Sequence, residues 1–171
     1  IAPSLVGSEM CIRDSFFVFH STQEHVQLLQ KQLLDEGLKN CGAIADEKIK
    51  SHILKSSVFA VAKSGTISLE ICNSKIPSII IYKMGTINFF IVKMLVKVKF
   101  ANIVNIAAGE EVIPELLQSK CNAKDIYNTV DKLMNDKTAL ENQLNKTQSI
   151  ISNFKTDKSS EIASSILKDY I

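Results

Sequence analysis

Arginine is almost absent from this sequence, because Arg13 is the only one and the other positive charges are lysines. Arginine holds phosphate through two parallel hydrogen bonds, so recognition of that kind is excluded beyond Arg13. Neither sign of charge dominates, since the formal net charge is +2. The composition therefore gives no argument for a nucleic-acid partner, and we expect none.

Closely spaced metal ligands are lacking as well. No two cysteines form a C-x-x-C pair, the three histidines show no ligand spacing, and no cluster of carboxylates stands out. We therefore expect no metal and no cofactor. Scattered cysteines indicate a reducing cytoplasm, where they serve as small core residues. The four are Cys11, Cys41, Cys72 and Cys121.

A long uninterrupted apolar run is missing too. The most apolar region, 87–108, contains Lys93, Lys97 and Lys99, which are costly at a bilayer centre, so we expect no membrane span. No secretory signal pattern precedes the rest of the chain. With 171 residues, 46% of them hydrophobic, the chain is long enough for one domain with a real core.

Residues 1–15 look foreign to the rest. The stretch 4–15 resembles a translated sequencing adapter, and the only arginine falls inside it. We exclude 1–15 as a non-native segment and treat 16–171 as one domain. We accordingly expect the native protein to begin upstream, which would make this chain a fragment.

Alternating apolar strands and amphipathic helices predict the fold. Continuous apolar strands of this kind are typical of a parallel sheet with helices on both faces, which is an α/β, Rossmann-like arrangement with a helical C-terminal tail. The expected strands are 16–20, 41–45, 58–62, 78–82 and 103–106. The expected helices are 22–36 with Ser21 as N-cap, 47–55 with Asp46 as N-cap, one after residue 66, 87–98, 110–118, 123–134, 137–154 and one from 159.

The stretch 58–70 carries the candidate site. A buried strand, the turn Ser64-Gly65-Thr66 and a helix start predict a phosphate site, because backbone N–H groups of a first helical turn are free to bind an anion. Gly65 lets the anion approach the backbone, and Glu70 lies where it could accept hydrogen bonds from sugar hydroxyls. The alternative is an ordinary turn in which Ser or Thr caps the helix.

In these residues and in the blocks that follow them, the chain resembles lipid-A-disaccharide synthase, an inverting glycosyltransferase of the GT-B type. The resemblance extends from about residue 16 to the C-terminus. It rests on blocks at 64–70, 77–84, 95–99, 105–110 and 114–118, in that order.

The resemblance implies a donor-binding, Rossmann-like C-terminal domain. The donor would be UDP-2,3-diacylglucosamine, the acceptor 2,3-diacylglucosamine 1-phosphate (lipid X), and the product a β-1,6-linked disaccharide. Ser64, Gly65 and Thr66 would meet the diphosphate and Glu70 the ribose, while Asn105 and Gln118 would complete the donor (UDP) site. The resemblance leaves open a peripheral location at the inner face of the inner membrane, contact with that membrane surface, and a homodimer.

Two departures from the family pattern are visible. Val104 stands where the family usually has proline, which we expect to loosen the aim of Asn105. From the resemblance we also expect this chain to lack the N-terminal domain, which in the family carries the acceptor site and the expected general base, and an arginine-bearing loop. We therefore identify no catalytic residue here and expect this chain alone to be inactive.

Two other functions stay open at this point. One is the donor-binding half of another UDP-sugar transferase, such as the enzyme that completes the peptidoglycan lipid precursor. The other is a non-catalytic α/β interaction module that binds a partner through the apolar helix expected at 87–98. Donor choice tests the first alternative, and binding of UDP tests the second.

Overall fold

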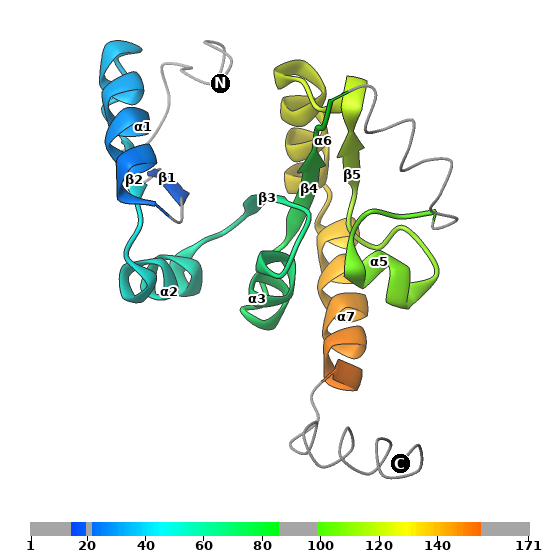
Figure 1. Ribbon diagram of the computed structural model, residues 1–171. Coiled ribbons are helices and arrows are strands. Elements are labelled where there is room, and N and C mark those ends of the chain that lie inside the picture. The colour runs from blue at the N-terminus through cyan, green and yellow to red at the C-terminus, as the bar shows by residue number, and fades with distance from the viewer. Residues whose placement is uncertain (1–14, 20–21, 86–98, 155–171) are drawn as a thin grey trace, which may run out of the picture. The chain divides into compact units, whose positions relative to one another are not determined.

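The computed structural model describes residues 15–19, 22–85 and 99–154 of the 171. Contacts divide the chain into two compact units, Ile1–Val58 and Phe59–Ile171. Each unit holds its own parallel sheet, of two and three strands respectively (Figure 1). The prediction of one domain over 16–171 stays a prediction, as does the foreign origin of 1–15.

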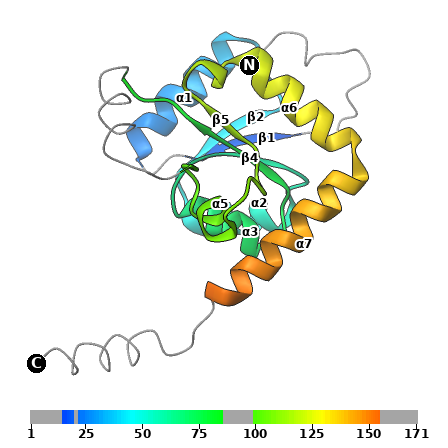
Figure 2. The ribbon, with the colours of Figure 1, turned by 90° about the vertical axis from the view of Figure 1, so that its right-hand side faces the viewer.

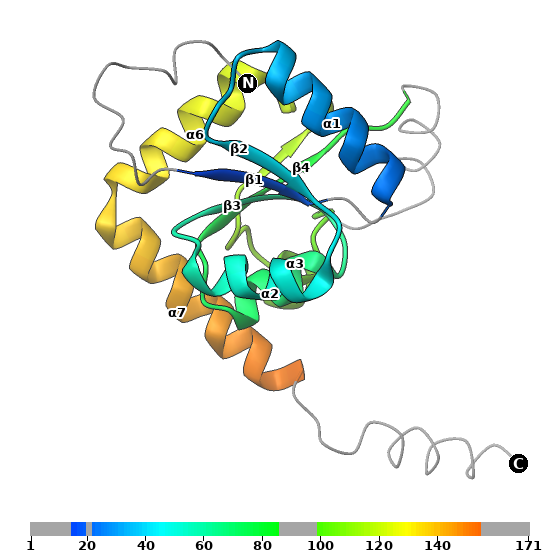
Figure 3. The same cartoon turned by 90° about the vertical axis from the view of Figure 1, so that its left-hand side faces the viewer.

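The first unit is a strand–helix–strand–helix arrangement. Strand β1 (Phe16–Phe19) pairs in parallel with β2 (Cys41–Ile44), and helix α1 (Gln23–Asp35) connects them, as Figure 3 shows. The side chain of Gln30 in α1 accepts a hydrogen bond of 3.0 Å from the main-chain N–H of Ala43, which ties this helix to β2. Both predicted strands are thereby confirmed, although β2 ends one residue earlier than predicted and residue 20 lies outside the described residues.

Of the two N-cap residues predicted for this unit, one is confirmed and one is wrong. Asp46 caps α2 (Glu47–Ser56) as predicted, because its carboxylate accepts the N–H groups of Lys48 and Ile49 at 2.8 and 2.9 Å. At α1 the N-cap is Thr22 rather than Ser21, and its hydroxyl lies 2.5 Å from Nδ1 of His25 instead of capping the backbone.

The second unit is built on the parallel sheet β3-β4-β5. Its strands are β3 (Ala60–Lys63), β4 (Ser78–Tyr82) and β5 (Glu115–Leu117), with β4 in the middle. Ile79 and Ile80 of β4 are fully buried, and they face opposite sides of the sheet because side chains alternate along a strand. A central strand buried on both faces is the pattern that the apolar run 78–82 predicted.

Helices cover both faces of this sheet, which confirms the α/β, Rossmann-like class. On the Ile79 face, Leu116 of β5 and Leu133 of α6 (Ala123–Asn135) form the buried cluster. Helices α3 (Ile67–Asn73) and α5 (Ile103–Ala108) belong to the other side. The long α7 (Lys137–Phe154) runs on from α6 and contacts α3 and α5 (Figure 2).

The stretch 103–106 is not the predicted strand but part of helix α5. The side chain of Asn102 caps the helix by accepting the N–H of Val104 at 2.8 Å, and Gly109 ends it with φ 69°. Its β-branched residues favour strands only weakly, so cap signals and burial of Val104 decide the outcome.

The stretch 110–118 is not the predicted helix, because it contains strand β5 instead. Pro114 disfavours helical conformation in the residue before it, so the chain enters Glu115 extended. Glu115 then pairs with Ile80 and Leu116 with Ile81 in the parallel ladder. A short 3-10 turn at Gln118–Lys120 follows the strand.

The remaining predictions have mixed outcomes. Strand β3 begins at Ala60, not at Val58, which is 74% exposed, because the ladder starts where Ala60 N–H donates to the carbonyl of Pro77. Asn122 and Asp136 cap α6 and α7 as predicted. The helices expected at 87–98 and from 159 lie outside the described residues. Within the described ranges no helix combines the length and apolar character that crossing a bilayer requires.

Candidate functional site

Three loops leave the same edge of the second sheet. Because β3, β4 and β5 are parallel, their carboxyl ends meet there, and ligands of parallel α/β sheets bind at that edge. Ser64 follows the last residue of β3, Lys83 follows β4, and Gln118 follows β5. Two parts of the predicted donor site, 54 residues apart in the sequence, thus belong to one edge.

The turn Ser64-Gly65-Thr66 connects β3 to α3, as predicted. Gly65 has φ 152°, a value that side-chain-bearing residues rarely adopt, and a Cβ built on it would meet nothing within 4 Å. Thr66 occupies the N-cap position of α3 without a capping hydrogen bond from its side chain. Ser64 donates its hydroxyl to the carbonyl of Ala101 at 2.6 Å. The simple alternative, in which Ser64 or Thr66 serves as a side-chain cap, is therefore not what the structure describes.

Glu70 lies in the first turn of α3 and is exposed. It follows the Ser64 turn closely enough in sequence to share a ligand with it. Its contact with a ribose stays a prediction.

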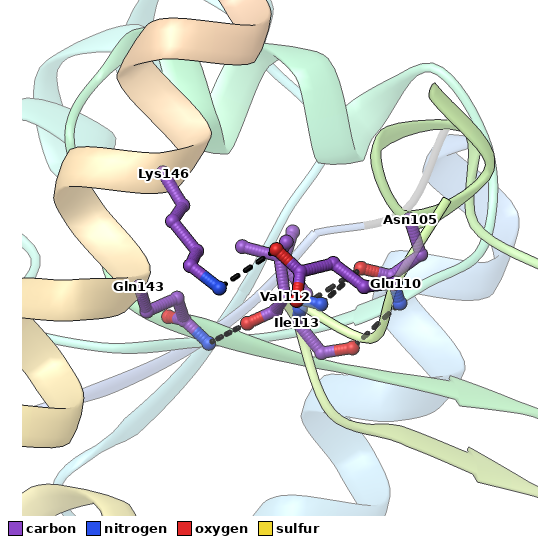
Figure 4. A network of polar contacts seen from close by, with 6 residues as sticks. All are labelled: Asn105, Glu110, Val112, Ile113, Gln143 and Lys146. Atoms are coloured by element: carbon purple, nitrogen blue, oxygen red, sulfur yellow. Dashed lines mark hydrogen bonds and ion pairs between the residues drawn. The ribbon is translucent and has the colours of Figure 1, made fainter. Parts of the chain in front are cut away.

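Asn105 is fully buried and uses its whole amide inside the protein. Its Oδ1 accepts the N–H groups of Val112 and Ile113, both at 2.9 Å. Its Nδ2 donates to the carbonyl of Ile113 at 2.7 Å and to Oε1 of Glu115 at 2.8 Å. Figure 4 shows these contacts with the 112–113 backbone. In this arrangement Asn105 orders the loop before β5, and its predicted contact with the donor stays a prediction.

The expected loosening of Asn105 by Val104 is wrong. Val104 is fully buried, and its N–H donates to Oδ1 of Asn102 at 2.8 Å, a bond that a proline could not make. The side chain of Asn105 is held by four hydrogen bonds, so its orientation is fixed.

Gln118 has two features that are uncommon away from functional sites. Its φ is 51°, in the left-handed region, which costs a residue with a side chain on the order of 1–3 kcal/mol. Its Oε1 accepts the N–H of Met84 at 3.4 Å, while its buried Nε2 has no partner among the described residues. A strained residue with an unused donor at the carboxyl edge is a candidate ligand contact.

A second unused donor lies next to Ala101, whose carbonyl accepts the Ser64 hydroxyl. Nδ2 of Asn102, a fully buried residue next to Ala101, also has no partner in the described part of the chain. Each buried donor left unpaired costs about 1–3 kcal/mol. Two such N–H donors are suited to acceptor groups such as phosphate or carbonyl oxygens.

Two residues near the site were missed by sequence reasoning. Glu115 lies in the stretch 110–118 that was predicted to be a helix, and it accepts three hydrogen bonds from the segment 101–105. Correct assignment of the strand after Pro114 would have drawn attention to it. Lys63, directly before Ser64, places its Nζ 5.4 Å from the ring centroid of Tyr82 at the ends of β3 and β4. A lysine at a strand end carries no distinctive pattern in the sequence.

The thiol of Cys72 in α3 has a structural role. Burial raises the pKa of the Cys72 thiol to about 11, so it stays neutral and packs as a core residue. In residues 15–19, 22–85 and 99–154 no group of three or more His, Cys, Asp or Glu side chains could hold a metal ion.

Fold and edge together define a class: an α/β, Rossmann-like protein with its candidate site where parallel strands end. A sequence profile for the family described as lipid-A-disaccharide synthetase matches residues 11–168. The chain belongs to this family.

Curated relatives support the same family. The chain is 38% identical over 128 residues to the lipid-A-disaccharide synthase of Rickettsia typhi, covering 73% of this chain and 33% of that protein. It is 40% identical over 128 residues to that of Rickettsia felis, covering 72% and 32%. It is 41% identical over 92 residues to that of a Sulfurihydrogenibium species, covering 54% and 24%. The chain thus spans about a third of the length of the first two relatives.

Proposed function

We propose that this chain is the C-terminal, nucleotide-sugar-binding part of a lipid-A-disaccharide synthase. The carboxyl edge of β3-β4-β5 binds the UDP part of UDP-2,3-diacylglucosamine. Transfer of the sugar to 2,3-diacylglucosamine 1-phosphate (lipid X) then gives the β-1,6-linked disaccharide and UDP. The observation that carries this proposal is that the Ser64 turn and Gln118, with its unused donor, follow strands that end at one edge.

Each predicted residue has a role in this proposal. The diphosphate lies against the open backbone of Gly65, with Ser64 and Thr66 on either side. Glu70 accepts hydrogen bonds from the ribose hydroxyls, and Nε2 of Gln118 donates to an acceptor on the nucleotide. Asn105 completes the donor site indirectly, because it fixes the loop that leads into β5.

An inverting transfer needs a base for the attacking hydroxyl and hydrogen-bond donors for the departing UDP. The described residues offer such donors in the unpaired side-chain amides of Gln118 and Asn102. We assign no catalytic base to this chain, and its lack of turnover on its own stays a prediction.

Both substrates carry acyl chains, which supports a place at the inner face of the inner membrane for the assembled enzyme. Membrane contact and a homodimer belong to the same proposal, as does a cytoplasmic site of action.

Calorimetric titration of the 171-residue chain with UDP tests the proposal. We expect saturable binding, and we expect Glu70→Ala to raise the dissociation constant about tenfold, because a carboxylate bonded to hydroxyls is lost. Glu141→Ala, which removes an exposed carboxylate of α7, is the matched control and should bind UDP like the unmodified chain. Circular dichroism establishes that all three samples are folded.

Other outcomes would favour the open alternatives. A folded chain that does not bind UDP would contradict the proposal and favour an interaction module. Binding of UDP without preference for UDP-2,3-diacylglucosamine over UDP-N-acetylglucosamine would favour another UDP-sugar transferase.

A further inference from the structure

The carboxylate of Glu115 holds a segment that is far from it in the sequence. Its Oε2 accepts the N–H of Ala101 at 2.8 Å, and its Oε1 accepts the N–H of Asn102 at 2.9 Å and Nδ2 of Asn105 at 2.8 Å. Glu115 is the first residue of β5, so the carboxylate joins the sheet to the chain that enters α5. Both of its oxygens are used as acceptors.

The segment held by Glu115 in turn contacts the Ser64 turn. The carbonyl of Ala101, whose own N–H binds Glu115, accepts the hydroxyl of Ser64 at 2.6 Å. A continuous path of short hydrogen bonds therefore runs from β5 through Ala101 to the end of β3. Within the described residues this hydrogen bond alone fixes the direction of the Ser64 hydroxyl.

We propose that Glu115 is a positioning residue for donor binding, which orients the Ser64-Gly65-Thr66 turn through Ala101 and does not itself touch the ligand. This inference rests on the proposed binding of UDP at that turn. The ligand chemistry is a nucleoside diphosphate, whose phosphate oxygens need backbone N–H groups held at a fixed spacing.

A carboxylate is required here, and an amide of the same shape cannot replace it. Three N–H groups converge on two oxygens, so every contact needs an acceptor. In Glu115→Gln one oxygen becomes an NH₂ group that meets an N–H donor, and at least one bond is lost. Glu115→Asp keeps both acceptors but is one methylene shorter, so it should restore part of the function.

Titration with UDP at low temperature, with the folding of each variant checked by circular dichroism, tests the inference. We expect Glu115→Gln to raise the dissociation constant about tenfold, Glu115→Asp to raise it less, and Glu141→Gln on α7 to leave it unchanged. If Glu115 acts through Ser64, the double variant Glu115→Gln, Ser64→Ala should bind UDP little worse than whichever single variant has the lower affinity. A residue that merely stabilised the fold would lower the melting temperature without this coupling in affinity.

The possible failures are distinguishable. No binding of UDP by the unmodified chain refutes the proposed function itself. Binding by the unmodified chain together with unchanged affinity in Glu115→Gln, or with additive effects in the double variant, overturns the role of Glu115. Should Glu115→Gln not fold, Ser64→Ala breaks the same path from its other end, and unchanged affinity there would equally overturn it.

Discussion

At the scale of single residues, Gln118 combines backbone strain with an unused donor. Its φ of 51° is one of two left-handed values found for non-glycine residues in the described part of the chain, the other being at Lys75. Strain of this kind persists where the surrounding structure holds it, and it is concentrated at binding sites. Gln118 follows β5 and accepts the N–H of Met84, so the strain occurs where the donor is proposed to bind.

Substitution of Gln118 separates strain from binding. Gly fits a left-handed position and Ala does not, so Gln118→Gly should be more stable than Gln118→Ala by about 1 kcal/mol, the reverse of their usual order. Both should weaken UDP binding to the same extent, because both lack the amide. Urea denaturation gives the stabilities and calorimetry the affinities. A Gln118→Ala chain more stable than Gln118→Gly would show that the backbone there is not strained.

The residues of the candidate site were predictable in unequal measure. The Ser64 turn has a local signal, namely a strand followed by small residues and a helix start. Gln118 was reached only through the resemblance, because its φ and its unpaired amide depend on contacts with a loop 34 residues away. The bonds of Glu115 were out of reach for the same reason, since its partners lie 10 to 14 residues upstream.

At the scale of elements, sequence patterns predicted strands best where the strands are central. The run 78–82 is buried on both faces, and its bounds match β4. The exchange of helix and strand at 103–106 and 110–118 has a common cause. Both are short, and tertiary bonds of Asn105 and Glu115 decide their conformation more than local propensity does.

The buried side chain of Gln143 hydrogen-bonds helix α7 to the sheet. Gln143 accepts the N–H of Ser78 at 2.8 Å and donates to the carbonyls of Ser78 and Val112 at 3.0 and 3.4 Å. One turn further, Lys146 pairs with Glu110 at 2.7 Å, but both side chains are more than half exposed (Figure 4). Burial therefore ranks the first contact far above the second.

Gln143→Leu should lower the free energy of unfolding by roughly 2–3 kcal/mol, because it leaves the N–H and the carbonyl of Ser78 buried without partners. Lys146→Met, which removes the exposed ion pair on the same helix, should lower it by less than about 1 kcal/mol. Urea denaturation of the two variants measures both values. Equal losses would mean that Gln143 does not connect α7 to β4.

At the scale of the whole molecule, the fold class followed from the alternation of strands and helices, whereas the division of the chain did not. The break at Val58 and Phe59 leaves no proline, glycine or charge run in the sequence. It reflects which strands pair: β1 only with β2, and β3 only with β4, within the described residues. Pairing partners depend on the folded chain and not on local composition.

This division predicts where a bound ligand acts. Every residue proposed to contact or order the donor lies in Phe59–Ile171, so UDP should stabilise that unit. At a concentration 100 times its dissociation constant, a ligand adds about 2.7 kcal/mol to the stability of the form that binds it. In hydrogen exchange, UDP should slow the amides of Ile79 and Ile80 in β4 and leave those of Cys41–Ile44 in β2 unchanged. The Glu70→Ala chain, at the same UDP concentration, should show less slowing in β4. Equal slowing in β2 and β4 would mean that the two units open as one, and slowing in β2 alone would place the nucleotide in the wrong unit.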